Sequence, residues 1–159
     1  MGIVCNFLRV SNETINYLLA NPDISDDYLS ENYASVFGKF HRENDTVFYT
    51  DKAWSVALYL LKESNPTLSI YLEGNMLTND SDKYIRPEEV LIVYNNIKLI
   101  VPDTLKKFHD YGKMMQNHIY GADKFTIESW DYVKEHIITI QDAFSKAAAC
   151  NEGIILYFS

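Results

Sequence analysis

The two ends of the chain carry the pattern that most restricts the fold, because both are short apolar runs with almost no polar alternation. Residues 3–10 read IVCNFLRV and residues 154–158 read IILYF. A strand that is apolar on both faces is typical of the interior of a sheet rather than of its edge. Pairing with neighbouring strands also satisfies the backbone groups of such buried segments. We therefore expect both terminal strands to join one sheet.

Between these strands, apolar residues recur mostly at helical spacing. Candidate helix starts, each a capping residue or a proline ahead of an apolar face, occur at Ser11, Asp23 or Ser25, Thr50, Pro87, Pro102 and Thr126. A helix within residues 23–44 would present Tyr28, Leu29, Tyr33 and Phe37. The helix that starts near Thr126 is predicted to be the longest, since its apolar residues continue through residue 147.

A third strand is predicted at residues 68–72 (LSIYL), which are followed by the turn-prone residues 73–75 (EGN). Several helices around a small sheet make an α+β fold rather than a regularly alternating β-α chain. The 159 residues correspond to about one domain. We expect a single α+β domain over residues 1–159, with the N-terminal strand, the strand at 68–72 and the C-terminal strand in one helix-covered sheet.

The charge balance argues against nucleic acid and anionic membranes as partners. The chain has 14 basic and 22 acidic residues, a formal net charge of −8, whereas phosphate binding needs clustered Lys and Arg. The same balance permits a basic protein partner. The longest apolar runs, such as residues 56–61, are far shorter than the roughly 18 residues that suggest a membrane span. The N-terminus also lacks the basic leader of a signal peptide, so we expect a soluble, cytoplasmic protein.

Motifs for catalysis, metals and cofactors are missing from the sequence. It contains no G-x-S-x-G elbow, no Walker loop and no G-x-G-x-x-G, and its four histidines form no H-x-x-x-H pair. We therefore predict no metal site and no cofactor. Cys5 and Cys150 are the only cysteines, which leaves open one bridge between them or two buried free thiols. The free thiols are favoured, because Cys packs as a small apolar group.

Two polar residues, Asn6 and Arg9, interrupt the apolar N-terminal strand. Alternation along a strand points their side chains to opposite faces, so they cannot share one site on the same side. A buried guanidinium needs carboxylate or backbone oxygens as partners. The favoured interpretation is an ion pair between Arg9 and an acid such as Asp51, and the alternative is ligand binding.

Two further clusters are candidates for a binding site. Asp51 and Trp54 place a carboxylate and an indole at one helix start, where they could frame a small pocket. The favoured alternative is that Asp51 supplies a negative charge at the N-terminus of the helix and that Trp54 is an anchor in the core. Lys83 and Tyr84 stand shortly before two glutamates at a helix start. Together these groups could supply charges to a cleft, although the acids more often complement the helix dipole.

Several segments, in order along the chain, resemble the YfbM-like family of bacterial proteins of unknown function. They are residues 2–11 (GIVCNFLRVS), 51–54 (DKAW), 59–61 (YLL), 84–90 (YIRPEEV), and 147–148 (AA) leading to 153–154 (GI). Two segments depart from the family. Residues 73–75 (EGN) stand where it usually has a glycine pair, and residues 79–83 (NDSDK) stand where it usually has a Gly-Tyr-Gly-Pro-Ala-Arg run. Lys83 lacks the planar fork of the arginine in that run. The resemblance implies an α+β cytoplasmic bacterial protein and no established activity.

These observations support two hypotheses about function. The first is a non-enzymatic acidic binding or interaction protein, of an immunity-like or regulatory kind, with a basic protein as partner. It rests on the net charge, the twelve tyrosines and the missing catalytic motifs. The alternative is a small-molecule-binding protein or enzyme with a pocket around Arg9, Asp51, Trp54, Lys83 and Tyr84. A pocket where these side chains converge favours the alternative, and a broad exposed acidic-aromatic face favours the first hypothesis.

Overall fold

The computed structural model describes residues 2–33, 45–78 and 81–159. Their sheet has the order β2-β1-β5-β4-β3, and every neighbouring pair is antiparallel. The strands are β1 (Cys5–Val10), β2 (Val47–Tyr49), β3 (Asn75–Met76), β4 (Lys83–Ile85) and β5 (Gly153–Phe158). The terminal strands β1 and β5 pair along their whole length in the middle of the sheet. The α+β class and the shared sheet of the two chain ends are confirmed.

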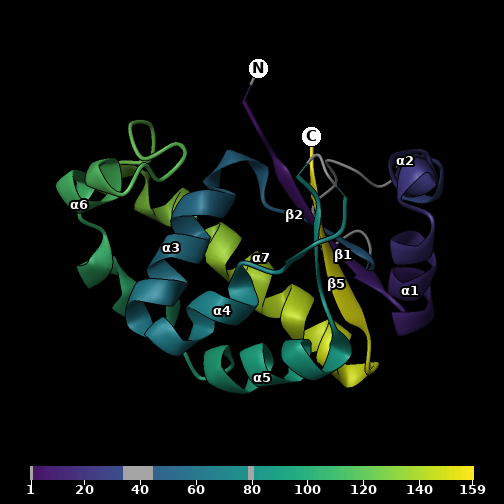
Figure 1. Ribbon diagram of the computed structural model, residues 1–159. Helices are drawn as coiled ribbons and strands as arrows, with labels where there is room; N and C mark the ends of the chain where they lie inside the picture. Colours follow the sequence, from purple (N-terminus) through teal and green to yellow (C-terminus); the bar gives the residue numbers. More distant parts are fainter. Residues whose placement is uncertain (1, 34–44, 79–80) are drawn as a thin grey trace.

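Helices cover both faces of this sheet (Figure 1). The α-helices are α1 (Asn12–Ala20), α2 (Ser25–Tyr33), α3 (Trp54–Ser64), α4 (Ser69–Leu72), α5 (Pro87–Ile97), α6 (Tyr111–Gln116) and α7 (Trp130–Ala149). Short 3-10 helices cover Pro22–Ile24, Asp51–Ala53, Pro66–Leu68, Pro102–Phe108 and Ile127–Ser129. Figure 1 shows α1 and α2 on one side of the sheet, with α3, α4, α5 and α7 on the other.

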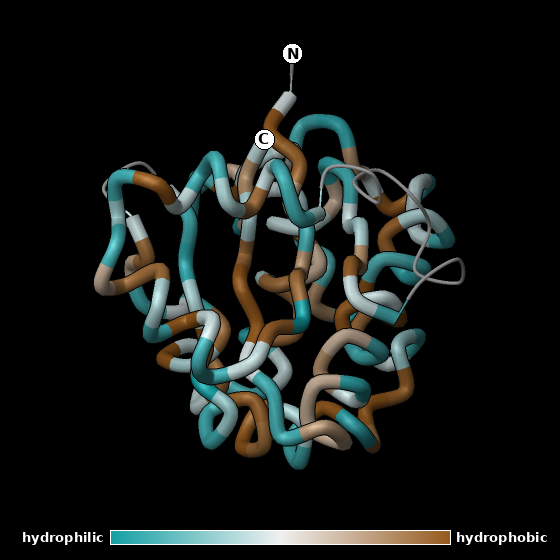
Figure 2. Tube along the Cα trace, turned by 90° about the vertical axis from the view of Figure 1, so that its right-hand side faces the viewer, coloured by the Kyte–Doolittle hydropathy of each residue, from teal (hydrophilic) through white to brown (hydrophobic). Residues whose placement is uncertain are grey.

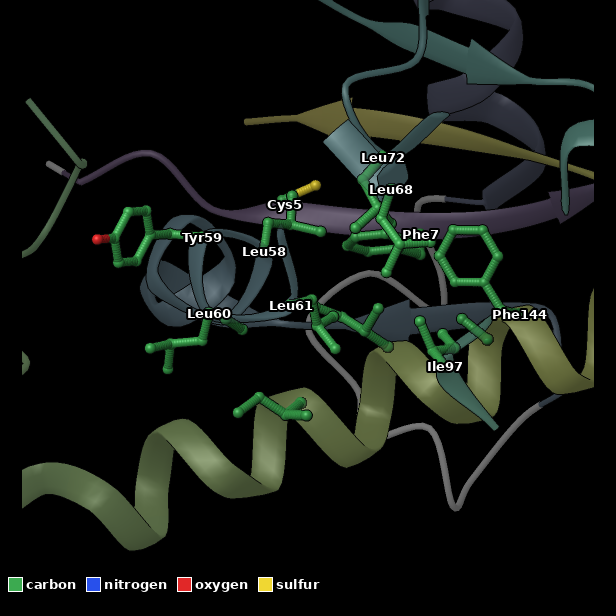
Figure 3. Close-up of a cluster of buried hydrophobic side chains, with 14 of the residues drawn as sticks. Cys5, Phe7, Leu58, Tyr59, Leu60, Leu61, Leu68, Leu72, Ile97 and Phe144 are labelled. Carbon is green, nitrogen blue, oxygen red and sulfur yellow. The ribbon is translucent and has the colours of Figure 1, made fainter. Parts of the chain in front are cut away.

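Successive residues of β1 enter two different cores, which explains why this strand is apolar on both faces. Phe7 belongs to the larger cluster, beneath α3, α5 and α7, where its ring meets Phe144 edge to face at 6.3 Å (Figure 3). Leu8 belongs to the smaller cluster, with Ile15 of α1 and Leu29 of α2. The C-terminal strand β5 is likewise mostly hydrophobic, as its brown colour in Figure 2 shows. Burial on both faces is what the terminal sequences predicted.

The predicted strand at residues 68–72 is wrong, because this segment is helical. Asn65 accepts a hydrogen bond from the backbone N–H of Thr67, and the 3-10 helix Pro66–Leu68 continues into α4. Leu68 and Leu72 are buried while Ile70 is 79% exposed, which is the i, i+4 pattern of a helix. The strand beside β5 is instead β4, which the sequence analysis did not predict.

Helix boundaries also differ in part from the predictions. Ser11 caps α1 as expected, since its side chain accepts from the backbone N–H of Thr14. The Thr50 hydroxyl is not a cap and donates to the carbonyl of Cys5 at 2.8 Å. The segment from Pro102 is a 3-10 helix followed by the separate α6. Residues 25–33 form α2 as expected, whereas the predicted contribution of Phe37 lies outside the described residues.

The two cysteines are free thiols, as favoured from the sequence. Cys5 is buried, and this burial raises the pKa of its thiol well above the ordinary value. Cys150 is exposed at the end of α7, so the prediction that both are buried is wrong for this residue. Among the residues that the structure describes, no helix is both long enough and apolar enough to cross a membrane.

Candidate functional site

A surface pocket of about 420 Å³ lies on the α3 side of the sheet, at the end where β1 begins and β5 ends. We call it the Trp54 pocket, and its lining consists of Ile3, Trp54, Met76, Ser81, Lys83, Phe158 and Ser159. Its volume falls within the range of about 300–1,000 Å³ that is usual for small-molecule sites. Both chain ends lie at this end of the molecule (Figure 1).

The indole of Trp54 is fixed by contacts on several sides. Its Nε1–H donates to the carbonyl of Ile3 at 3.1 Å. The ring meets Phe158 edge to face, with centroids 5.0 Å apart, and stacks on Tyr120 at 5.9 Å. Because α3 begins at Trp54, the helix start and both chain ends together hold the ring in place. The aromatic wall of the pocket is therefore held by contacts from three separate segments of the chain.

Lys83 enters the pocket from β4. It lies opposite Leu156 of β5 and Met76 of β3, and opposite residues of paired strands share a face. Leu156 belongs to the core under α3 and α7, so Lys83 emerges on the α3 side. Its side chain is half-buried. Within the described part of the chain, no carboxylate forms a salt bridge with its ammonium group.

A second, acidic hollow of about 480 Å³ adjoins the Trp54 pocket and shares Ser81 and Phe158 with it. Its carboxylates come from Asp23, Asp26 and Asp82. Two of them serve the fold directly. Asp82 accepts the backbone N–H of Phe158 at 2.9 Å, and Asp26 accepts the hydroxyl of Tyr157 at 3.2 Å. Burial and the nearby Asp26 raise the pKa of Tyr157 to about 12.

Asp51 lies outside both hollows and ties β2 to α7. Its carboxylate accepts hydrogen bonds from the hydroxyls of Tyr49, at 3.0 Å, and Tyr132. Partial burial favours a higher pKa for Asp51, but these two hydrogen bonds outweigh it and hold the pKa below its ordinary value. Burial and the bond to Asp51 raise the pKa of Tyr49 to about 12 and that of Tyr132 still further.

The backbone of Asp51 has φ +43°, in the left-handed region that Asp and Asn tolerate better than most residues. The hydrogen bonds from Tyr49 and Tyr132 therefore hold a residue of unusual backbone conformation at the start of the 3-10 helix Asp51–Ala53.

The predicted pair between Arg9 and Asp51 does not form. Arg9 instead contacts Glu152, with Nε 2.8 Å from Oε2. Glu152 immediately precedes β5, whose residue Ile154 lies opposite Arg9. The partner is therefore an acid brought close by the pairing of the two terminal strands, and not one near the start of α3.

Asn6 and Tyr84 both lie on the α1–α2 side of the sheet, away from the Trp54 pocket. Asn6 is opposite Tyr157 and is 1% exposed. Its Oδ1 accepts no hydrogen bond from the part of the chain that the structure describes. Tyr84 packs against the smaller core, and the Arg86 guanidinium lies 5.4 Å from its ring centre.

Of the residues singled out from the sequence, Trp54 and Lys83 meet at the pocket, while Asn6, Arg9, Asp51 and Tyr84 do not line it. Ile3, Met76 and Phe158 also line the pocket but were not among the site residues predicted from the sequence. An antiparallel pairing of the two terminal strands would have brought Ile3 near Phe158, so a signal existed for these two. For Met76 there was none. No group of three or more His, Cys, Asp and Glu suited to a metal ion occurs in the described ranges.

Comparison with known proteins gives a family but no activity. Residues 1–157 match the family described as "Domain of unknown function (DUF1877)". The structure is similar to that of a protein of unknown function, YfbM from Escherichia coli, with a TM-score of 0.66 and 15% sequence identity. The match covers 98% of this chain and 99% of that chain. No curated protein matches. The resemblance to the YfbM-like family is thus confirmed, and the chain belongs to the DUF1877 family of unknown function.

Proposed function

We propose that this protein is a non-enzymatic binding protein whose ligand places an apolar group in the Trp54 pocket. The observation that carries the proposal is the exposed apolar surface of the pocket. Ile3 is 48% exposed and Met76 is 55% exposed, although both line the same concavity. Clustered apolar surface in a concave site is typical of ligand-binding grooves.

The contacts that hold the aromatic wall in place support this proposal. Trp54 is held by a hydrogen bond and two ring contacts. Close by, Val4 and Ser159 exchange two backbone hydrogen bonds, of 2.9 and 3.2 Å. A preformed wall keeps the entropic cost of binding low, because few side chains are immobilised by the ligand.

The lining also favours binding over catalysis. Among the described residues that line the pocket, no side chain is a carboxylate, an imidazole or a thiol. These groups most often act as general bases or nucleophiles. Of the two hypotheses from the sequence, the meeting of Trp54 and Lys83 favours a small-molecule ligand. The pocket contains only two of the five residues predicted to line it, because Arg9, Asp51 and Tyr84 make contacts elsewhere.

Titration with the neutral dye N-phenylnaphthylamine tests the proposal, because its emission rises when it leaves water. We expect saturable binding to the native protein. Met76→Gln removes apolar lining at an exposed position. It should raise the dissociation constant about fivefold, which corresponds to about 1 kcal/mol of lost apolar burial. Ile70→Gln is the matched control, because Ile70 is 79% exposed and does not line the pocket. Absence of saturable binding, or equal weakening in both variants, contradicts the proposal.

A basic protein partner is the second candidate, and the acidic hollow beside the pocket favours it. Three aspartates line this hollow in a chain of net charge −8. We expect a tetra-arginine peptide to bind in a calorimetric titration at low salt. Asp23→Asn should weaken binding more than the control Asp123→Asn does. Asp123 is an exposed acid that does not line the hollow. Equal effects of the two variants would mean that the peptide responds to overall charge alone.

A further inference from the structure

The cation in the Trp54 pocket restricts the chemistry of the ligand beyond its apolar character. Lys83 is half-buried beside aromatic and aliphatic walls. The charge of an ammonium group in such a pocket is stabilised by water as long as the pocket is open to solvent. A ligand that fills the pocket displaces this water, and a charge that loses water without gaining a partner is costly.

Resting on the proposed function, we infer that the ligand of the Trp54 pocket is a small organic anion, with an aromatic or aliphatic body against Trp54 and Phe158 and an anionic group on the Lys83 ammonium. A carboxylate or sulfonate restores the contacts that the displaced water made. Charge-assisted hydrogen bonds of this kind are also about twice as strong as neutral ones.

The neighbouring titratable groups leave this cation available. Cys5 lies close enough to interact electrostatically with Lys83 and Asp82, and its burial raises the pKa of the thiol, so the thiol stays neutral. The carboxylate of Asp82 accepts the backbone N–H of Phe158 and forms no salt bridge with Lys83 among the described residues. The only basic side chain in the described lining is that of Lys83.

The net charge of the chain sharpens the inference. At −8 the protein as a whole repels anions, so non-specific attraction does not explain anion binding. An anion that binds must be held by a local contact, and its affinity should depend on one side chain rather than on the summed charge.

Two dyes with nearly the same aromatic body separate this inference from the proposed function. N-phenylnaphthylamine is neutral, and anilinonaphthalene sulfonate carries one negative charge. We expect the native protein to bind the sulfonate about tenfold more tightly than the neutral dye, the effect of one charged hydrogen bond. Lys83→Gln should abolish this preference and leave the neutral dye nearly unchanged. Lys83→Arg should keep most of the preference, since the positive charge remains.

Lys98→Gln is the matched control, because Lys98 is exposed at the C-terminal end of α5, away from the pocket. All variants are first compared with the native protein by thermal unfolding, because the sulfonate dye also binds partly unfolded chains. Equal affinities of the native protein for both dyes, or equal losses in Lys83→Gln and Lys98→Gln, would overturn the inference and leave the proposed function intact. Failure of both dyes to bind overturns the proposed function as well.

Discussion

Asp51 joins β2, the start of α3 and the long helix α7, and replacing it measures how much this junction contributes to the free energy of unfolding. Its carboxylate accepts hydrogen bonds from Tyr49 and Tyr132, and its φ is +43°. Hydrogen bonds to a charged group contribute roughly 1.5–3 kcal/mol each. Because Asp51 is half-buried, the lower end applies, and the two bonds together contribute about 3 kcal/mol.

Two substitutions separate the hydrogen bonds from the backbone effect. Asp51→Ala loses both bonds and forces a left-handed conformation on alanine, which costs about 1–2 kcal/mol more. We therefore expect it to lower the free energy of unfolding by about 4 kcal/mol. Tyr49 and Tyr132 donate to different oxygens of Asp51, and Asp51→Asn keeps only one of these acceptors. Because Asn tolerates the left-handed region, this variant should lose about 2 kcal/mol, less than the alanine variant. Urea unfolding at pH 7, followed by circular dichroism, measures both values.

The pH dependence gives an independent check. The pKa of Asp51 lies below its ordinary value in the folded protein, since the bonds from Tyr132 and Tyr49 outweigh partial burial. Such a carboxyl stabilises the fold fully above its unfolded pKa of about 3.9 and loses this contribution as the pH falls through the folded pKa. The difference between the native protein and Asp51→Asn should therefore be constant near pH 7 and start to close below about pH 4.

The control for these measurements is Asp123→Asn, at an exposed acid for which no hydrogen bond is seen among the described residues. This role of Asp51 is refuted if Asp51→Ala unfolds at the same urea concentration as the native protein. It is also refuted if Tyr132→Phe, which removes one of the two donors, is as stable as the native protein.

Further variants test the packing of the core. Phe144→Ala, at a fully buried position of α7, should lower the free energy of unfolding by about 3–5 kcal/mol in urea; a loss below about 1 kcal/mol would contradict the packing described. Gly153→Ala puts a Cβ 2.4 Å from Cδ1 of Ile15 and 2.7 Å from the backbone oxygen of Ile85, and should cost about 1–3 kcal/mol. In Gly112→Ala the added Cβ meets only a side-chain oxygen at 3.5 Å, and the helical position should gain up to about 1 kcal/mol. Thermal unfolding of the two glycine variants should show opposite shifts, and equal shifts would contradict the geometry.

The parts of the fold that could be predicted from the sequence are those whose pattern has a single physical explanation. A run that is apolar on both faces fits the middle of a sheet, and β1 and β5 lie there. Apolar residues at spacings of three and four over five turns fit one long helix, and α7 has 20 residues. The cap at Ser11 was predictable because it depends only on neighbouring residues.

The errors arose where a short segment has two physical explanations. Residues 68–72 alternate apolar and polar side chains as a strand does, but Leu68 and Leu72 are also one helical turn apart. The choice between helix and strand is made by the packing of Leu68 and Leu72 against α3 and α5. These tertiary contacts cannot be predicted from a five-residue segment. The strands β2, β3 and β4 have three, two and three residues. Runs of this length carry no period, and only their neighbours make them strands.

The Trp54 pocket shows the same limit for a site. Trp54 and Lys83 stood out because each is chemically distinctive within its own segment, but Ile3, Met76 and Phe158 become site residues only through tertiary contact. The pocket therefore exists only when both chain ends, α3 and the β3–β4 pair are docked together. If the proposed function holds, ligand binding is linked to folding of these elements, and a ligand at about 100 times its dissociation constant should stabilise the native state by about 2.7 kcal/mol. The indole that anchors both chain ends also lines the pocket, so under the proposed function one side chain serves both packing and binding.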